Sequence, residues 1–196
     1  MANDVLRSFF AIGLDEAARR AAVLRIRALG ECPGGDAVRW VAPENLHVTL
    51  RFMGDVERSA LPELAEAVRR ATASVPGFTL RLGGVRIFPS RRRPVAVTLD
   101  LEPEAPLRDL AGAIERGVRA AGFAAEKRPF RSHLTLGRVR RGKRSAFPEP
   151  SEEFEAPLDV ACEIERAGLF RSELSPEGAR YTVLEEFPLA ASEPGG

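Results

Sequence analysis

The chain has 196 residues, enough for one ordinary domain with a sizeable core. Its 44% hydrophobic and 29% charged residues exclude extensive disorder, and its formal net charge of +1 argues against a generic binder of polyanions. No apolar run approaches the roughly 18 residues of a membrane span, and the first residues lack the pattern of a signal peptide. We therefore expect a cytoplasmic protein without membrane contact. We also expect the protein to be a monomer.

Hydrophobic periodicity divides the first half of the chain into six elements. We predict a buried strand (7–14), an Ala-rich helix ended by Gly30 (15–29), a short strand (38–41), a longer strand closed by Gly54 and Asp55 (46–53), a second helix (58–74) and extended structure broken at Gly83 and Gly84 (78–88).

The second half repeats part of this order. We predict a strand (94–101), a helix (104–121), a strand (132–140), a loop (142–157), two further strands (158–170 and 179–189) and a flexible tail (191–196). Strand, helix and strand thus recur at nearly the same spacing. This favours two duplicated lobes, 7–88 and 94–189, within one domain covering 1–190. Two unrelated units with coincident spacing are the alternative.

The two cysteines, Cys32 and Cys162, have neither the spacing of a metal site nor that of a disulfide framework. We expect both to be free thiols in a reducing compartment.

The only two histidines each begin the pattern His-x-Thr-x, at residues 47–50 and 133–136. Both patterns lie in apolar stretches that we assign to strands, where alternate side chains share a face. His47 then lies beside Thr49, and His133 beside Thr135, with the apolar residues of each motif turned to the core. If the two strands are equivalent members of a repeat, the two polar pairs can face each other across one cleft.

Such a pair of histidines suits displacement at phosphorus. One imidazole activates the attacking oxygen and the other protonates the leaving oxygen, while hydroxyls and arginines stabilise the non-bridging oxygens. The chain lacks the histidine and carboxylate clusters that bind catalytic metals, so we expect no metal or other cofactor. Structural histidines, or a metal held by the two histidines and a carboxylate, are the alternatives.

Basic residues cluster around the second motif. Residues 126–144 contain one acidic residue and eight basic residues: Lys127, Arg128, Arg131, Arg138, Arg140, Arg141, Lys143 and Arg144. We interpret this cluster as facing an anionic substrate. For the shorter run Arg91–Arg93, a solvated surface is an equal alternative.

The chain resembles the two-histidine phosphoesterases, and among them the bacterial and archaeal RNA 2',3'-cyclic phosphodiesterases also called 2'-5' RNA ligases. The resemblance covers nearly the whole chain and is carried by residues 7–12, 38–54, 82–89, 128–138, 170–174 and 178–184. It implies a bilobal α+β fold with two antiparallel sheets related by a pseudo-twofold axis, helices outside and a central cleft between the motifs.

The resemblance also implies roles for residues. His47 would donate a proton to the departing 3' oxygen and His133 would activate water, with Thr49 and Thr135 as phosphate ligands. Arg138 resembles a further phosphate ligand, although strict alternation turns it away from His133 unless a bulge near Gly137 re-aims it.

Two aromatic residues are further candidates for the substrate site, and one position departs from the family's pattern. Phe9 and Trp40 are candidates for stacking a base, and core packing is the more common role of such residues. Ser132 stands where the family often has proline, which affects how the strand enters the cleft.

The expected function is metal-independent hydrolysis of RNA 3' ends bearing a 2',3'-cyclic phosphate to 2'-phosphate, with tRNA fragments as one candidate partner. Alternatives are 2'-5' RNA ligation, a phosphodiesterase of small cyclic nucleotides or 2'-5' oligonucleotides, and a non-catalytic module that binds RNA ends.

Overall fold

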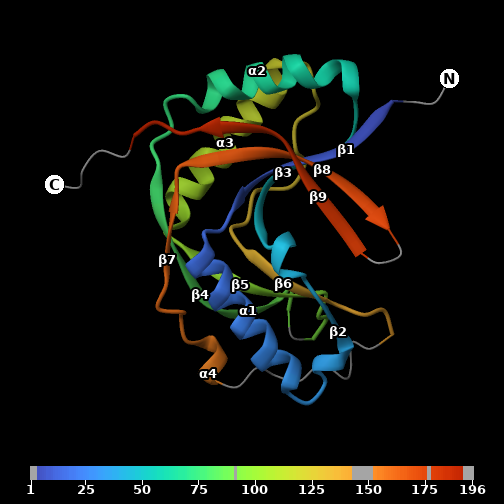
Figure 1. Cartoon of the computed structure of the whole chain (residues 1–196), viewed down its shortest axis with the longest axis vertical. Helices are drawn as coiled ribbons and strands as arrows, with labels where there is room; N and C mark the ends of the chain where they lie inside the picture. Colours follow the sequence, from blue (N-terminus) through green and yellow to red (C-terminus); the bar gives the residue numbers. More distant parts are fainter. Residues whose placement is uncertain (1–3, 91, 143–151, 176–177, 192–196) are drawn as a thin grey trace.

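Two antiparallel sheets form the framework of this computed structural model, which describes residues 4–90, 92–142, 152–175 and 178–191 (Figure 1). The four-stranded sheet has the order β3-β1-β8-β9, with β1 (Val5–Gly13), β3 (His47–Glu57), β8 (Arg166–Ser175) and β9 (Gly178–Pro188). The five-stranded sheet has the order β2-β6-β5-β4-β7, with β2 (Val38–Trp40), β4 (Phe78–Phe88), β5 (Ala96–Glu102), β6 (Leu134–Val139) and β7 (Ala161–Ile164). The predicted α+β class with two antiparallel sheets is confirmed.

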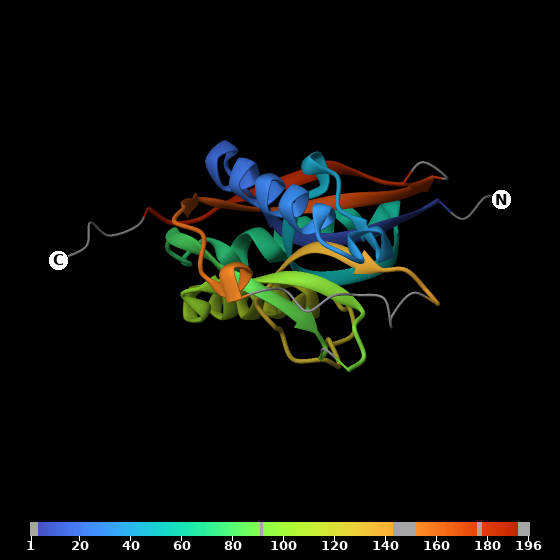
Figure 2. The same cartoon turned by 90° about the horizontal axis from the view of Figure 1, so that it is seen from below.

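The long helices cover the outer sides of the two sheets. Helices α2 (Leu61–Thr72) and α3 (Glu104–Ala120) pack on each other and against β9 and β3, whereas α1 (Glu16–Glu31) packs against β2, β6 and β7. Figures 1 and 2 both show α1 and α3 at opposite sides of the molecule. Among the described residues, none of the helices is long and apolar enough to span a membrane.

Local sequence explains where these elements begin and end. The Asp15 side chain caps α1 by accepting a hydrogen bond from the Ala18 amide at 2.8 Å. The helix continues one residue past the predicted stop at Gly30, to Glu31. Both cysteines are free, as predicted, and Cys162 is buried in β7.

Two glycine positions predicted to interrupt strands produce bulges instead. Strand β3 runs through Gly54 to Glu57, because Gly54 adopts φ 71° where the register with β1 shifts between Ser8 and Phe9. Glycine alone adopts this left-handed conformation without strain, and it allows an extra residue in the strand. Strand β4 is likewise continuous, with a register shift between Leu82 and Val85.

The predicted strand 158–170 is wrong as a single element. Residues 161–164 form β7 beside β4, and after Glu165 the chain crosses to the other sheet as β8 beside β1. The predicted loop 142–157 also contains the short helix α4 (Glu152–Glu155), while residues 143–151 lie outside the described part of the chain. An apolar run alone does not distinguish one strand from two strands in different sheets.

Each sheet takes strands from both halves of the sequence. Strands β1 and β3 share one sheet with β8 and β9, and β2 and β4 share the other with β5, β6 and β7. The predicted lobes 7–88 and 94–189 therefore do not coincide with the two sheets, and a duplication of the two halves stays a prediction.

Gly117 permits a close contact between α2 and α3. A Cβ atom at this position would lie 2.6 Å from the Cα of Val68 and 2.9 Å from the carbonyl oxygen of Ala67. Both are backbone atoms, so the helices must separate to accommodate even a methyl group. We expect Gly117→Ala to lower the free energy of unfolding by about 1–3 kcal/mol.

Urea unfolding with linear extrapolation measures this effect. Gly112→Ala on the same helix is the matched control, because its nearest neighbour would be the Arg116 side chain at an ordinary 3.6 Å. This control should raise the free energy of unfolding by about 0.5–1 kcal/mol through helix propensity. Equal effects of the two substitutions would show that the helix contact does not limit stability.

Candidate active site

A cavity of about 320 Å³, here called the inter-sheet cavity, lies where the two sheets meet. Its lining comes from β1, β3, β8 and β9 of one sheet and from β6 of the other. The structure brings together in this one cavity the four polar residues of the two motifs, His47, Thr49, His133 and Thr135, and the further candidate Arg138.

His47 is the first residue of β3, and strand alternation orients it as predicted. Val48 and Leu50 are buried in the core, whereas His47 and Thr49 face the cavity. The His47 Nδ1 lies 2.7 Å from the Asn45 carbonyl oxygen, to which it donates, and Nε2 lies 3.0 Å from Thr49 Oγ1. A neutral His47 therefore carries its proton on Nδ1 and keeps Nε2 as the acceptor that faces the cavity.

Aromatic rings enclose the His47 imidazole. The ring of Phe9 lies 4.9 Å away between centroids, and Tyr181 contacts it edge-on at 5.1 Å. Burial lowers the pKa of His47 below its ordinary value of 6.5. The hydrogen bond to the Asn45 carbonyl raises this pKa, and the positive charges of Arg138 and His133 lower it, so the net shift is downward.

His133, immediately before β6, is held by the same kind of hydrogen bond to the backbone as His47. Its Nδ1 lies 2.9 Å from the carbonyl oxygen of Arg131, two residues earlier, as His47 bonds to Asn45. The two histidines therefore share a tautomer with Nε2 as the reactive nitrogen. Their surroundings differ, because Phe9 and Tyr181 contact His47, whereas His133 stacks in parallel on Phe88 with 6.1 Å between centroids.

A bulge aims Arg138 at the cavity. Along the β5–β6 pair, Thr98 faces Thr135 but Val97 faces Gly137, so β6 has one additional residue at Leu136. Strict alternation would turn Arg138 away from His133, but this bulge returns it to the face of Thr135. Gly137 has no room for a side chain, since a Cβ atom would lie 2.5 Å from the Val38 side chain in β2.

The described lining of the inter-sheet cavity contains cations and no carboxylate. Arg7 and Arg138 line it together with the two histidines, and no Asp or Glu is among the described lining residues. Of the predicted basic cluster, Arg131 lines a neighbouring cavity and Lys127, Arg128, Arg140 and Arg141 are exposed elsewhere. Lys143, Arg144 and Arg91 lie outside the described residues. Such a lining favours an anion.

The two aromatic candidates have different positions. Phe9 lines the inter-sheet cavity but is only 3% exposed, in a group of rings that includes Phe170 and Tyr181. Trp40 lines none of the cavities described here; it packs against the core, and its ring would contact a side chain at Gly137. The structure thus leaves Phe9 as the only one of the two beside the histidines.

Several residues at the site were not predicted from sequence, among them Arg7, Asn45 and Tyr181. Tyr181, the chain's one tyrosine, lies on β9 and contacts both His47 and Phe9. Asn45 fixes His47 with its carbonyl, and its side chain donates to the Ala179 carbonyl oxygen at 2.7 Å. Neither contact has a signal in the sequence, because the carbonyl that holds His47 belongs to the backbone, as it does for His133, and the approach of β9 depends on tertiary structure.

The imidazole, hydroxyl and guanidinium groups that line this site are typical of a site for an anion rather than for a metal ion. Throughout the described ranges, no three or more His, Cys, Asp or Glu side chains gather into a group suited to a metal ion. The expectation of a metal-independent reaction stays a prediction, and chelation tests it.

Comparison with known proteins identifies the family of this chain. The model of the 2'-5' RNA ligase superfamily matches residues 15–175, most of the chain. This chain belongs to that superfamily. An RNA 2',3'-cyclic phosphodiesterase of Methanothermobacter thermautotrophicus is 34% identical over 186 residues, which cover 94% of this chain and 99% of the relative.

Solved structures of the superfamily share the whole fold. LigT of E. coli in its apo form superimposes with a TM-score of 0.77 at 28% identity, covering 97% of this chain and 99% of LigT. A crystal structure of a protein from Thermus thermophilus gives a TM-score of 0.76 at 30% identity and covers 96% of this chain and all of its own. The 2'-5' RNA ligase fold therefore extends across both sheets.

Because the chain contains only two histidines, the pKa of His47 can be measured directly by NMR titration of the imidazole resonances. We expect His47, assigned with the His47→Gln variant, to titrate below 6.5, and inorganic phosphate to raise its pKa by favouring the imidazolium. Arg138→Gln should also raise the pKa, because it removes a neighbouring cation. A His47 pKa at or above 6.5 that does not respond to Arg138→Gln would contradict this description.

Proposed function

We propose that this enzyme hydrolyses the 2',3'-cyclic phosphate at RNA 3' ends to a 2'-phosphate. The observation that carries the proposal is the inter-sheet cavity, in which two histidines, two threonines and two arginines converge and the described lining has no carboxylate. The related RNA 2',3'-cyclic phosphodiesterase, matched along nearly its whole length, supports the same substrate.

In the proposed reaction, His133 acts as base and His47 as acid. Neutral His133 accepts a proton from water at Nε2 while the water oxygen attacks phosphorus. The bond from phosphorus to O3' breaks opposite the incoming oxygen, and protonated His47 donates its Nε2 proton to O3'. This assignment of acid and base follows the roles that the resemblance to the family implies.

Thr49, Thr135 and Arg138 stabilise the phosphorane-like transition state. The hydroxyl groups donate to the non-bridging oxygens, and the guanidinium offsets the negative charge that grows on them. Thr49 also holds Nε2 of the neutral His47, so its hydroxyl is already directed to the reacting region. Phe9 is only 3% exposed and packs against the His47 imidazole, so we propose that it positions His47 rather than stacks a base.

RNA 3' ends with a cyclic phosphate, tRNA fragments among them, are the proposed partners, and the proposed state is a cytoplasmic monomer. A monomer elutes in gel filtration at the 21.3 kDa of one chain.

Turnover of an oligoribonucleotide ending in a 2',3'-cyclic phosphate tests the proposed reaction. We expect the rate to fall on both the acid and the alkaline side of an optimum, because one histidine must be protonated and the other neutral. We also expect the same rate after EDTA treatment and dialysis. Loss of activity with EDTA that a divalent cation restores would overturn the metal-independent mechanism. Binding of the RNA without any product would favour a binding module instead.

A further inference from the structure

Arg51 lies on β3 directly after the first motif, but it is not among the described residues that line the inter-sheet cavity. The register of β3 with β1 shifts after Thr49, so Leu50 is an additional residue there, as Leu136 is in β6. This bulge interrupts the alternation, and Phe52 rather than Arg51 lines the cavity beyond Thr49. The proposed hydrolysis assigns no role to Arg51.

The Arg51 guanidinium joins three parts of the chain. Its side chain is only 11% exposed, and Nε donates to Glu115 of α3 at 2.8 Å while Nη1 donates to Glu126 at 3.0 Å. Nη2 donates to the Ala124 carbonyl oxygen at 2.8 Å, and Nη1 also donates to the carbonyl oxygen of Phe52. We call Arg51, Glu115 and Glu126 the Arg51 bridge. Because one guanidinium holds two carboxylates, its loss leaves two like charges without a partner between them.

The Arg51 bridge fixes the segment 121–133, which connects α3 to β6. The structure describes this segment in full, and it contains no helix or strand. The Glu126 amide donates to Glu115 at 3.0 Å, and the Glu126 carboxylate accepts from the Lys127 amide at 2.8 Å and from the Arg128 amide at 3.3 Å. The segment is therefore attached to β3 and α3 through side chains.

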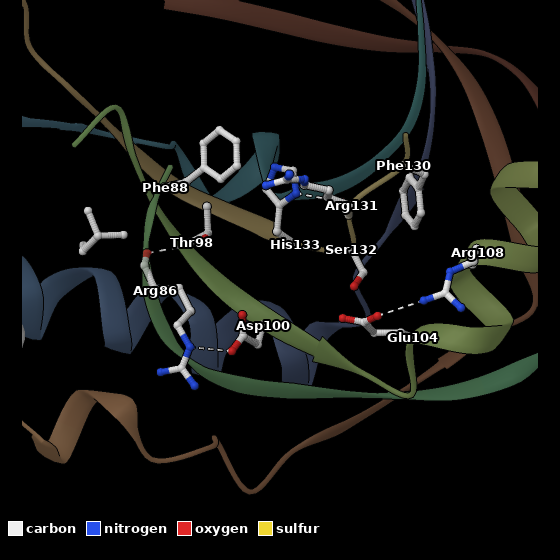
Figure 3. A pocket seen from close by; sticks show the side chains of 11 residues that line it. Arg86, Phe88, Thr98, Asp100, Glu104, Arg108, Phe130, Arg131, Ser132 and His133 are labelled. Carbon is white, nitrogen blue, oxygen red and sulfur yellow. Dashed lines mark hydrogen bonds and ion pairs between the residues drawn. The ribbon is translucent and has the colours of Figure 1, made fainter. Parts of the chain in front are cut away.

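The same segment ends at His133. Figure 3 shows its last residues, Phe130, Arg131 and Ser132, beside a cavity of about 270 Å³ that His133 also lines. The Arg131 carbonyl oxygen lies 2.9 Å from Nδ1 of His133. The position of this backbone therefore sets the direction in which the reactive Nε2 points.

His47 has a separate anchor. The Asn45 carbonyl holds its Nδ1, and the Asn45 side chain donates to the Ala179 carbonyl oxygen of β9. Tyr181 of the same strand contacts the imidazole. Arg51 is thus close to His47 in the sequence, whereas its side chain is connected to the segment that carries His133.

We propose that Arg51 is a positioning residue for His133, and that the Arg51 bridge sets the distance and direction between the two histidines. This inference rests on the proposed function. The bridge connects β3, which carries His47 and Thr49, to the segment that carries the histidine of the other sheet. Both imidazoles must reach oxygens on one phosphorus atom, and a displacement of about 1 Å can cost about 100-fold in rate.

NMR spectra of the imidazoles test this connection, because the chain contains only two histidines. The His47→Gln variant assigns the resonances. Arg51→Gln should shift the ring resonances of His133 more than those of His47, whereas a local effect on β3 would do the opposite. Phe123 and Phe130 pack against the core on either side of Glu126, so the variant should fold.

Steady-state kinetics provide the second measurement. Arg51→Gln should lower kcat for a cyclic-phosphate-ended RNA by about 10–100-fold and change KM by less than about threefold, because the groups that contact the substrate are retained. Arg51→Lys should recover part of kcat and part of the His133 shift. It restores the charge, but an ammonium group does not reproduce the fork of donors that reaches three partners.

Glu126→Gln breaks the Arg51 bridge from the other side. One Glu126 oxygen accepts from the Lys127 and Arg128 amides and the other binds Arg51, so glutamine retains the first contacts and loses the second. This variant should shift the same His133 resonances. Combined with Arg51→Gln, it should lose no more kcat than the larger single loss, because both substitutions remove one contact.

Arg58→Gln is the matched control. Arg58 directly follows β3 and binds a carboxylate at 2.9 Å, but its partner is Asp4. Its loss should leave kcat and both imidazoles as in the wild type.

Three results with Arg51→Gln would overturn the proposal: a larger shift at His47 than at His133, no shift at either imidazole, or an unchanged kcat beside measurable turnover by the wild type. If the wild type does not turn over the cyclic phosphate, the proposed function has failed. The NMR comparison then still decides whether Arg51 positions His133, so the two failures are distinguishable.

Discussion

His47→Gln and His133→Gln are each expected to lower kcat/KM for a cyclic-phosphate-ended RNA by about 10²–10⁴-fold, the usual contribution of general acid or base catalysis. Glutamine retains hydrogen-bonding capacity but does not transfer a proton near neutral pH. The core contacts of each motif come from Val48, Leu50, Leu134 and Leu136, which are buried, so both variants should fold.

Steady-state kinetics on both variants and the double variant measure this effect, with thermal unfolding as the control for folding. The double variant should lose much less than the product of the single losses, because one transition state requires both proton transfers. Activity within about tenfold of the wild type in either single variant would rule out the two-histidine mechanism.

Arg138→Gln has the second largest expected effect, a loss of about 10²–10³-fold in kcat, as for removal of a preorganised donor to a developing oxyanion. Arg138→Lys should recover part of the loss, since it restores the charge but not the two-pronged geometry of the guanidinium. The measurement is kcat at saturating substrate for both variants.

Arg140→Gln is the matched control for charge. Arg140 follows β6, is exposed and does not line the inter-sheet cavity, so its loss should change kcat less than about threefold, as expected for a surface charge. Equal losses at both positions would mean that Arg138 acts through the general positive potential rather than at phosphorus.

Local patterns predicted the parts of the site that depend on strand alternation. The order His47, Val48, Thr49 contains enough information to place two polar side chains opposite a buried one, and the structure has this arrangement. Alternation alone placed Arg138 on the wrong face, because the bulge at Leu136 that returns this arginine to the cavity is set by the pairing of β6 with β5.

The differences between the two motifs could not be predicted from sequence. The tetrapeptides are nearly symmetric, but Tyr181 and Phe9 enclose His47, whereas Phe88 contacts His133. These neighbours come from strands distant in sequence, and their positions depend on how the sheets assemble. The split of residues 158–170 between two sheets was missed for the same reason.

The most direct test of the central claim is the position of the product phosphate. An oligoribonucleotide ending in a 2',3'-cyclic phosphate is hydrolysed to completion, and the product is compared by chromatography with authentic 2'- and 3'-phosphate standards. If His47 protonates O3' and His133 activates water, the product is the 2'-phosphate alone. A 3'-phosphate would mean that O2' departs, and would contradict the roles assigned to the two histidines.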